Sequence, residues 1–174
     1  LNRTDKKNAL TGERYHGISD AFDRLESDNS LRVGLITGSA DCFTAGNDLV
    51  DFLSASSIGG DSPVGRFLRT LPALTKPLVA AVNGPAIGVG TTMLLHCDLV
   101  YAAPGAKFQM PFVNLALCSE AGSSLLLSQR LGYRRAAELL LLCELFTAED
   151  AKEMGIVSQV VAAEEYQAFA LQKA

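Results

Sequence analysis

The sequence has no tryptophan, only two histidines and no apolar run long enough to cross a membrane. A membrane-spanning helix needs roughly 18–20 apolar residues, whereas the longest apolar run, Ala136 to Cys143, is short and interrupted by Glu138. Positive charge is also scarce, since 15 basic residues stand against 19 acidic ones and no basic cluster occurs. We therefore expect no membrane insertion and no nucleic-acid partner.

The motifs of several common enzyme classes are absent as well. Neither His16 nor His96 has a cysteine or an acidic residue at metal-ligand spacing, and no HExxH, GxSxG or GK[ST] motif occurs. The segment GVGTTM, residues 88–93, lacks the last glycine of GxGxxG. These absences argue against a metal site, a serine nucleophile on a strand–helix turn, a P-loop and a dinucleotide site.

Cysteine is sparse for a chain of 174 residues: Cys42, Cys97, Cys118 and Cys143 lie far apart and form no CxxC pair. We expect all four to be small buried apolar residues of a reduced, intracellular protein. A cytoplasmic location is predicted, with a peroxisome or mitochondrion left open. The chain starts without methionine and its last residues have a helical pattern, so we interpret both ends as trimmed.

Helical and strand patterns alternate along the chain with short connections. Apolar residues recur at spacings of three and four between Tyr15 and Leu25, which predicts a helix over 11–27 with Thr11 as its N-cap. Short runs of aliphatic residues predict buried strands, and this order predicts an α/β fold with a largely parallel sheet. The other predicted elements are strands at 31–37, 78–82, 98–102, 107–110 and 156–161, a loop at 54–63, and helices at 64–74, 90–97, 119–131, 133–143 and from Thr147.

Two glycine-bearing segments, CFTAGNDL at 42–49 and AIGVG at 86–90, follow strand-like runs. A buried strand rarely gives way to glycine and two short polar side chains, and a surface turn rarely carries Cys42 and Phe43. A backbone that turns inward to offer its N–H groups would explain both. The second segment precedes a predicted helix, whose first N–H groups are unpaired. Two such groups converging on one point would form an oxyanion hole, although glycines that merely turn the chain are common here.

Taken together, several segments resemble the crotonase (enoyl-CoA hydratase/isomerase) superfamily. They occur in family order and extend over nearly the whole chain: NAL at 8–10, FTAGNDL at 43–49, KPLVAAVNGPAIG at 76–88, CDLVYA at 97–102 and TAEDA at 147–151. The resemblance implies one core domain over 1–174, a spiral of ββα units with a mainly parallel sheet and outer helices. We expect the family's first strand and its C-terminal helices, which usually mediate trimer packing, to be missing from this sequence. The resemblance also implies a homotrimer or hexamer.

The resemblance assigns catalytic roles residue by residue. Two backbone N–H groups of the family hold the thioester oxygen of an acyl-CoA, and the matching positions are Asn47 and Val89. The two glutamates of a typical hydratase fall at Thr92 and Phe112, neither of which can activate water. Glu120, in LCSEAGSS, instead resembles the catalytic base of the peroxisomal-type Δ3,Δ2-enoyl-CoA isomerases.

We expect the Glu120 carboxylate to share one apolar cavity with both N–H groups, which would raise its pKa towards neutrality. Lys6 and Lys7 lie where family members bring basic groups to the CoA phosphates, and Asp48 is expected to fix its loop. The residues expected at the substrate are Ala45, Asp48, Leu49, Gly88, Phe112, Leu117, Lys6 and Lys7.

The resemblance implies an acyl-CoA isomerase that moves a double bond from C3 to C2 with one glutamate base. CoA enters as part of the acyl-CoA substrate, so we expect no separate cofactor. One alternative is another crotonase reaction, by a hydratase or hydrolase with a relocated acid. A second is a catalytically silent protein that binds acyl-CoA or a partner, which would have no need of Glu120. The segment 53–65, which should shape the acyl pocket, follows no readable pattern.

Overall fold

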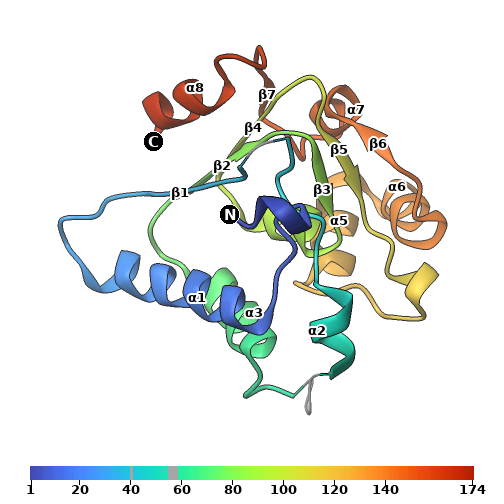
Figure 1. Ribbon diagram of the computed structural model, residues 1–174. Coiled ribbons are helices and arrows are strands. Elements are labelled where there is room, and N and C mark those ends of the chain that lie inside the picture. The colour runs from blue at the N-terminus through green and yellow to red at the C-terminus, as the bar shows by residue number, and fades with distance from the viewer. Residues whose placement is uncertain (40, 55–58) are drawn as a thin grey trace.

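A four-stranded, entirely parallel sheet forms the centre of the computed structural model, which describes residues 1–39, 41–54 and 59–174 (Figure 1). Its order is β1-β2-β4-β7. The strands are β1 (Gly34–Thr37), β2 (Leu78–Val82), β4 (Leu99–Ala102) and β7 (Gln159–Val160). The predicted α/β architecture with a mainly parallel sheet is confirmed. The predicted strands at 31–37 and 156–161 are shorter than expected, and β1 is only half-buried because it lies at the edge of the sheet.

A second, three-stranded sheet lies beside the first (Figure 1). Strand β3, Pro85–Ile87, pairs in parallel with β5, Lys107–Gln109, and β5 pairs antiparallel with β6, Phe146–Thr147. The short strand β6 was not predicted. The Phe146 ring stacks on Phe108 with centroids 5.5 Å apart, so a contact distant in sequence holds β6 in place.

Helices surround both sheets, with α1 and α3 side by side and α8 across the molecule from them (Figure 1). The α-helices are α1 (Gly12–Ser27), α2 (Leu49–Ser54), α3 (Pro63–Ala73), α4 (Val89–Thr92), α5 (Ser123–Leu131), α6 (Tyr133–Ala137), α7 (Ala148–Glu153) and α8 (Tyr166–Lys173). Short turns of 3₁₀ helix are η1 (Thr4–Lys6), η2 (Met93–His96) and η3 (Val113–Leu115). The segment η4 (Glu138–Leu142) is a π-helix. Every helix in the described part of the chain is too short or too polar to cross a bilayer.

Strand β2 is buried on both faces, which explains its uninterrupted apolar sequence. Leu78, Ala80 and Val82 belong to the main core together with residues of α1 and α3. Val79 and Ala81 belong to a smaller cluster that includes residues of α8. This central strand ends at Val82, shortly before the second glycine-bearing segment begins at Ala86, so the best-buried part of the sheet supports that segment.

The helix predicted to start at Ser119 starts instead at Ser123. Ala121 and Gly122 have φ angles of 52° and 64°, and such left-handed residues cannot continue a right-handed helix. Ser119 therefore caps no helix. The segment 117–122, which carries Glu120, is an irregular turn rather than a first helical turn.

Two predicted helix starts have different outcomes. Helix α7, predicted from Thr147, opens with a capping box, in which the Thr147 side chain accepts from the Asp150 N–H and the Asp150 carboxylate accepts from the Thr147 N–H. Thr11 precedes α1 but makes no capping hydrogen bond through its side chain. The Gly12 N–H donates instead to the Asp51 carboxylate of α2 at 2.8 Å, which ties the two helices together.

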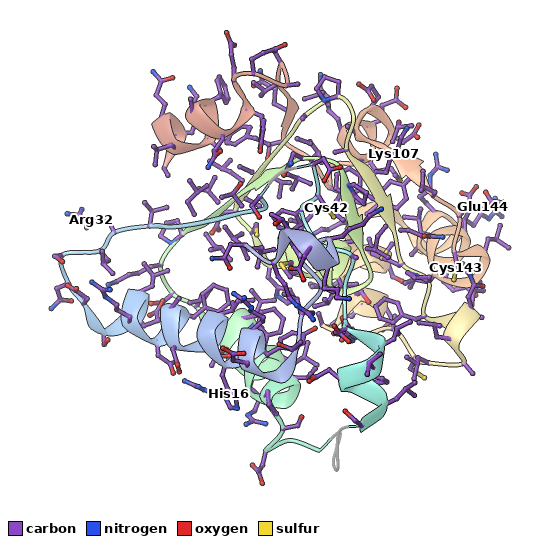
Figure 2. All side chains as sticks on the ribbon, in the orientation of Figure 1. His16, Arg32, Cys42, Lys107, Cys143 and Glu144 are labelled. Carbon is purple, nitrogen blue, oxygen red and sulfur yellow. The ribbon has the colours of Figure 1, made fainter. Side chains whose placement is uncertain are left out.

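The expected burial of the cysteines holds for Cys42 and Cys143, but Cys118 is exposed. Cys118 lies in the irregular turn before α5, where the chain leaves the core. His16 is exposed on the outer side of α1, as Figure 2 shows. Of the expected loop at 54–63, residues 55–58 lie outside the described residues, and its last residue, Pro63, begins α3.

Candidate active site

The two glycine-bearing segments run side by side in parallel. Thr44 and Ala86 form a parallel bridge, and the Ile87 N–H donates to the Thr44 carbonyl at 3.0 Å. Asn47 and Val89 each follow this bridge by three residues. Two segments far apart in the sequence therefore deliver the two predicted donor residues to the same place.

Glycine is required where the two segments approach each other. Gly46 has a φ of +87°, and a Cβ there would lie 2.8 Å from the Ile87 carbonyl oxygen, closer than real Cβ contacts. Gly88 has a φ of +57° and a ψ of −117°, a conformation that L side chains rarely adopt. At Gly46 both the backbone conformation and the lack of space exclude a side chain, whereas at Gly88 the conformation alone does so.

The Asn47 N–H has no hydrogen-bond acceptor among the described residues. On one side of it, the Leu10 N–H donates to the Gly46 carbonyl at 2.8 Å, and on the other the Asp48 N–H donates to the Leu10 carbonyl at 2.9 Å. In a trans peptide the N–H points opposite to the carbonyl of the same unit. Because the Gly46 carbonyl faces Leu10, the Asn47 N–H points away from Leu10.

Val89 is the first residue of α4, and its N–H likewise has no acceptor in the described part of the chain. The Gly88 carbonyl accepts from the N–H groups of Thr91 and Thr92 at 2.9 and 3.0 Å. The carbonyl therefore points along the helix, and the Val89 N–H points backwards, away from its start. Such a group is a ready donor for an oxygen outside the helix.

Both donor residues line one cavity of about 530 Å³, together with five of the residues expected at the substrate. The cavity is bordered by α2, by the two glycine-bearing segments and by the segment 111–117. None of its described lining residues carries a charge. The members that were expected from the sequence are Ala45, Asn47, Leu49, Gly88, Val89, Phe112 and Leu117.

Glu120 does not line this cavity, contrary to our expectation. The turn at Ala121 brings the half-buried Glu120 carboxylate to α4, where the Thr92 hydroxyl donates to it at 3.4 Å. The turn is held at two points: Ser123 donates to the Glu120 carbonyl through its N–H and hydroxyl at 3.0 and 2.7 Å, and His96 Nε2 donates to the Ala121 carbonyl at 2.7 Å. The carboxylate is thus held one helical turn from Val89.

Burial raises the pKa of Glu120 to about 7, an effect that the Thr92 hydrogen bond only partly offsets. Tyr15 lies close by: its burial and, secondarily, the Glu120 charge raise the pKa of the phenol well above its ordinary value. The Tyr15 hydroxyl donates a hydrogen bond to Asn47 Oδ1. Glu120 is therefore hydrogen-bonded to α4, which begins with Val89, while Tyr15, whose pKa the Glu120 charge affects, is hydrogen-bonded to Asn47.

Asp48 has a structural role in the loop rather than a place in the cavity. Its carboxylate pairs with Arg3 at 2.6 Å and accepts hydrogen bonds from the Val50 and Asp51 N–H groups at 3.1 and 3.2 Å. These partners hold the pKa of Asp48 below its ordinary value. The side chain thus fixes the start of α2 immediately after the Asn47 donor.

Lys6, the last residue of η1, and Lys7, which follows it, are exposed and do not line the cavity. The Lys7 carbonyl accepts from the Ala45 N–H at 2.9 Å, so this turn adjoins the first glycine-bearing segment. Their contact with CoA phosphates stays a prediction. Within the described residues, no group of three or more His, Cys, Asp or Glu side chains could hold a metal ion.

Three residues of the site were not identified as such from the sequence. Tyr15 was counted only as an apolar position of an amphipathic helix, His96 only as a histidine without a metal-ligand neighbour, and Thr92 only as the loss of a glutamate. Of these three residues, only Tyr15 could have been identified from the sequence, because a tyrosine hydroxyl on a buried helix face usually has a hydrogen-bond partner.

The family model described as "Enoyl-CoA hydratase/isomerase" matches residues 1–174. Enoyl-CoA delta isomerase 2 of Rattus norvegicus is 38% identical over 166 residues, which cover 92% of this chain and 42% of the rat protein. The 2,3-dehydroadipyl-CoA hydratase of Escherichia coli K12 is 34% identical over 177 residues, covering 100% of this chain and 69% of the bacterial protein. This chain therefore spans less than half of the rat relative's length.

A solved structure of similar shape is the enoyl-CoA hydratase/isomerase of Pseudoalteromonas atlantica T6c. It superposes with a TM-score of 0.96 at 43% identity and covers 100% of this chain and 69% of the other. The relatives thus include both isomerases and hydratases, and the reaction has to be inferred from the residues of the site.

Proposed function

This chain belongs to the enoyl-CoA hydratase/isomerase family, and we propose that it moves the double bond of a 3-enoyl-CoA to the 2-position. One observation carries the proposal: the half-buried Glu120 carboxylate, whose pKa is raised to about 7, accepts a hydrogen bond from Thr92, three residues after one of two N–H groups that have no acceptor among the described residues. These N–H groups belong to Asn47 and Val89, and both residues line one cavity whose described lining residues carry no charge.

The reaction needs one proton carrier and one oxyanion site. Glu120 removes a proton from C2, and the electrons of that bond shift into the thioester, whose oxygen accepts hydrogen bonds from the Asn47 and Val89 N–H groups. The resulting dienolate takes the same proton from Glu120 at C4, which leaves the double bond between C2 and C3. No atom is gained or lost, so the proposal includes no cofactor beyond the CoA of the substrate. A pKa near 7 lets one carboxyl group both take and return the proton.

Hydration is the alternative reaction, and the similarity to a hydratase at 34% identity keeps it in view. A hydratase or hydrolase must activate a water molecule, yet Thr92 and Phe112 stand where the sequence resemblance places the hydratase glutamates. A silent acyl-CoA-binding protein is a second alternative, but binding alone would not favour a buried carboxylate such as Glu120, since its burial is unfavourable.

The full-length protein should convert a 3-enoyl-CoA to the conjugated 2-enoyl-CoA, because one base and two donors suffice. The measurement is the rise in ultraviolet absorbance as the double bond conjugates with the thioester. The same protein mixed with a 2-enoyl-CoA should lower its absorbance only to the equilibrium mixture that is also reached from the 3-enoyl-CoA. A fall in absorbance below that equilibrium mixture would show hydration, and no change with either substrate would favour the silent binder.

We also propose that copies of the full-length protein assemble into trimers or dimers of trimers. Support comes from large apolar side chains that are exposed around η4, including Leu141 at 62%, Leu142 at 59% and Leu145 at 53%. Exposed apolar residues gathered on one segment are typical of an interface. Sedimentation should give a trimer or hexamer, and a stable full-length monomer would contradict the proposal.

A further inference from the structure

Tyr15 is buried on α1, with 1% of its surface exposed, yet its hydroxyl contacts Asn47 in the first glycine-bearing segment. We propose that Tyr15 is a positioning residue, which holds the side chain of Asn47 so that the Asn47 N–H stays directed into the cavity. This inference rests on the proposed oxyanion hole. It does not depend on which acyl-CoA reaction the site performs.

The Tyr15 ring is held rigidly. It packs against Phe67 of α3, with ring centroids 5.2 Å apart and planes inclined by 58°, and Phe67 in turn stacks on Phe22 at 6.2 Å. Phe67 is completely buried. A ring fixed in this way presents its hydroxyl at a defined point. The hydrogen bond to Asn47 Oδ1 therefore fixes the Asn47 side chain relative to α1.

The Asn47 backbone needs such a restraint because of the residue before it. Gly46 has no side chain and a φ of +87°, and glycine has more backbone freedom than any other residue. Leu10 holds the Gly46 carbonyl on one side of the peptide unit. Tyr15 holds the Asn47 side chain on the other side, and because Cβ is bonded directly to Cα, this contact limits rotation of the same peptide plane. The N–H between these two contacts is the proposed donor.

Tyr15→Phe removes the hydroxyl and leaves the ring in place, so the fold should persist. We expect turnover of 3-enoyl-CoA to fall about tenfold with little change in KM, because a misdirected donor weakens the transition state more than substrate binding. Phe22→Leu is the matched control: it perturbs the same aromatic cluster and the same helix without touching Asn47. That control should keep near-normal turnover per folded molecule.

A double-mutant cycle tests whether Tyr15 acts through Asn47. Asn47→Ala keeps the backbone N–H but removes the acceptor of the Tyr15 hydroxyl, so it should cause a loss similar to that of Tyr15→Phe. The double variant should be no worse than either single one. Losses that multiply in the double variant would overturn the proposal, because Tyr15 would then act by another route.

A spectroscopic probe separates this proposal from the isomerase assignment. The CoA thioester of 4-dimethylaminocinnamic acid should absorb at longer wavelength when its carbonyl accepts the two N–H bonds, whether or not the protein isomerises 3-enoyl-CoA. At saturation, Tyr15→Phe should show a smaller red shift than the unaltered protein and Phe22→Leu. An undiminished shift in Tyr15→Phe would overturn the positioning role. The absence of a shift in the unaltered protein would overturn both this role and the oxyanion hole, while a shift without isomerase turnover would overturn only the proposed reaction.

Discussion

Replacing Glu120 by glutamine should lower isomerase turnover at least ~10²-fold, the contribution typical of a positioned general base. Glutamine has nearly the same size and can still accept the Thr92 hydrogen bond, which is 3.4 Å long here, but it cannot take a proton from C2. Binding of acyl-CoA should survive, since both N–H donors belong to other segments. The measurement is kcat with 3-enoyl-CoA together with the Kd of a saturated acyl-CoA.

The matched control is Glu144→Gln, at an exposed carboxylate near the edge of the molecule in Figure 2. It makes the same chemical change away from the cavity and should leave turnover unchanged. If Glu120→Gln retained near-normal turnover, the glutamate would be only a buried residue of the turn before α5, and the isomerase proposal would lose its main support.

The pH dependence provides a second readout of the same residue. Burial raises the pKa of Glu120 to about 7, and the base must be ionised to accept the C2 proton. The kcat/KM of the unaltered protein should therefore rise about tenfold per pH unit below 7 and level off above it. Glu120→Gln should abolish this rise, whereas a rise centred near pH 4.5 would place the proton transfer on an ordinary exposed carboxylate.

Local sequence patterns were enough to predict an element where residues close together in the sequence determine its structure. Strand β2 has its predicted bounds, Leu78–Val82, because burial on both faces makes its whole sequence apolar. The capping box of α7 is local too, since Thr147 and Asp150 satisfy each other's N–H groups. The pairing of the two donor residues was predictable only through the family resemblance, because the parallel bridge between Thr44 and Ala86 joins distant segments.

Helix α2 shows why other parts could not be predicted. Leu49, Val50 and Leu53 are 54%, 79% and 83% exposed, and Leu49 and Leu53 line the cavity instead of the core. The apolar periodicity that identifies a core-facing helix is therefore missing. The setting of Glu120 was hidden for a different reason, because it depends on left-handed backbone at Ala121, a non-glycine residue that gives no sequence signal for such a turn.

Replacing Val89 by proline should lower turnover by ~10²–10³-fold, because proline has no N–H and the oxyanion would lose one of its two donors. The site suits this substitution unusually well. Val89 is the first residue of α4, where proline's fixed φ is compatible with a helix. The preceding Gly88 has no Cβ to clash with the proline ring. The substitution replaces the backbone hydrogen by the ring Cδ, which also lies where the oxyanion would accept its hydrogen bond, and it changes the packing of one side chain.

Val89→Ala separates these two losses. The Val89 side chain is 1% exposed, so both variants lose packing in the core, but only Val89→Pro loses the donor. Thermal unfolding should show that both variants fold, with reduced stability. Turnover with 3-enoyl-CoA should fall much further in Val89→Pro than in Val89→Ala, and so should the red shift of the dimethylaminocinnamoyl-CoA probe. Equal turnover in the two folded variants would remove the Val89 N–H from the mechanism, and the oxyanion would then have to be held by Asn47 and a group outside α4.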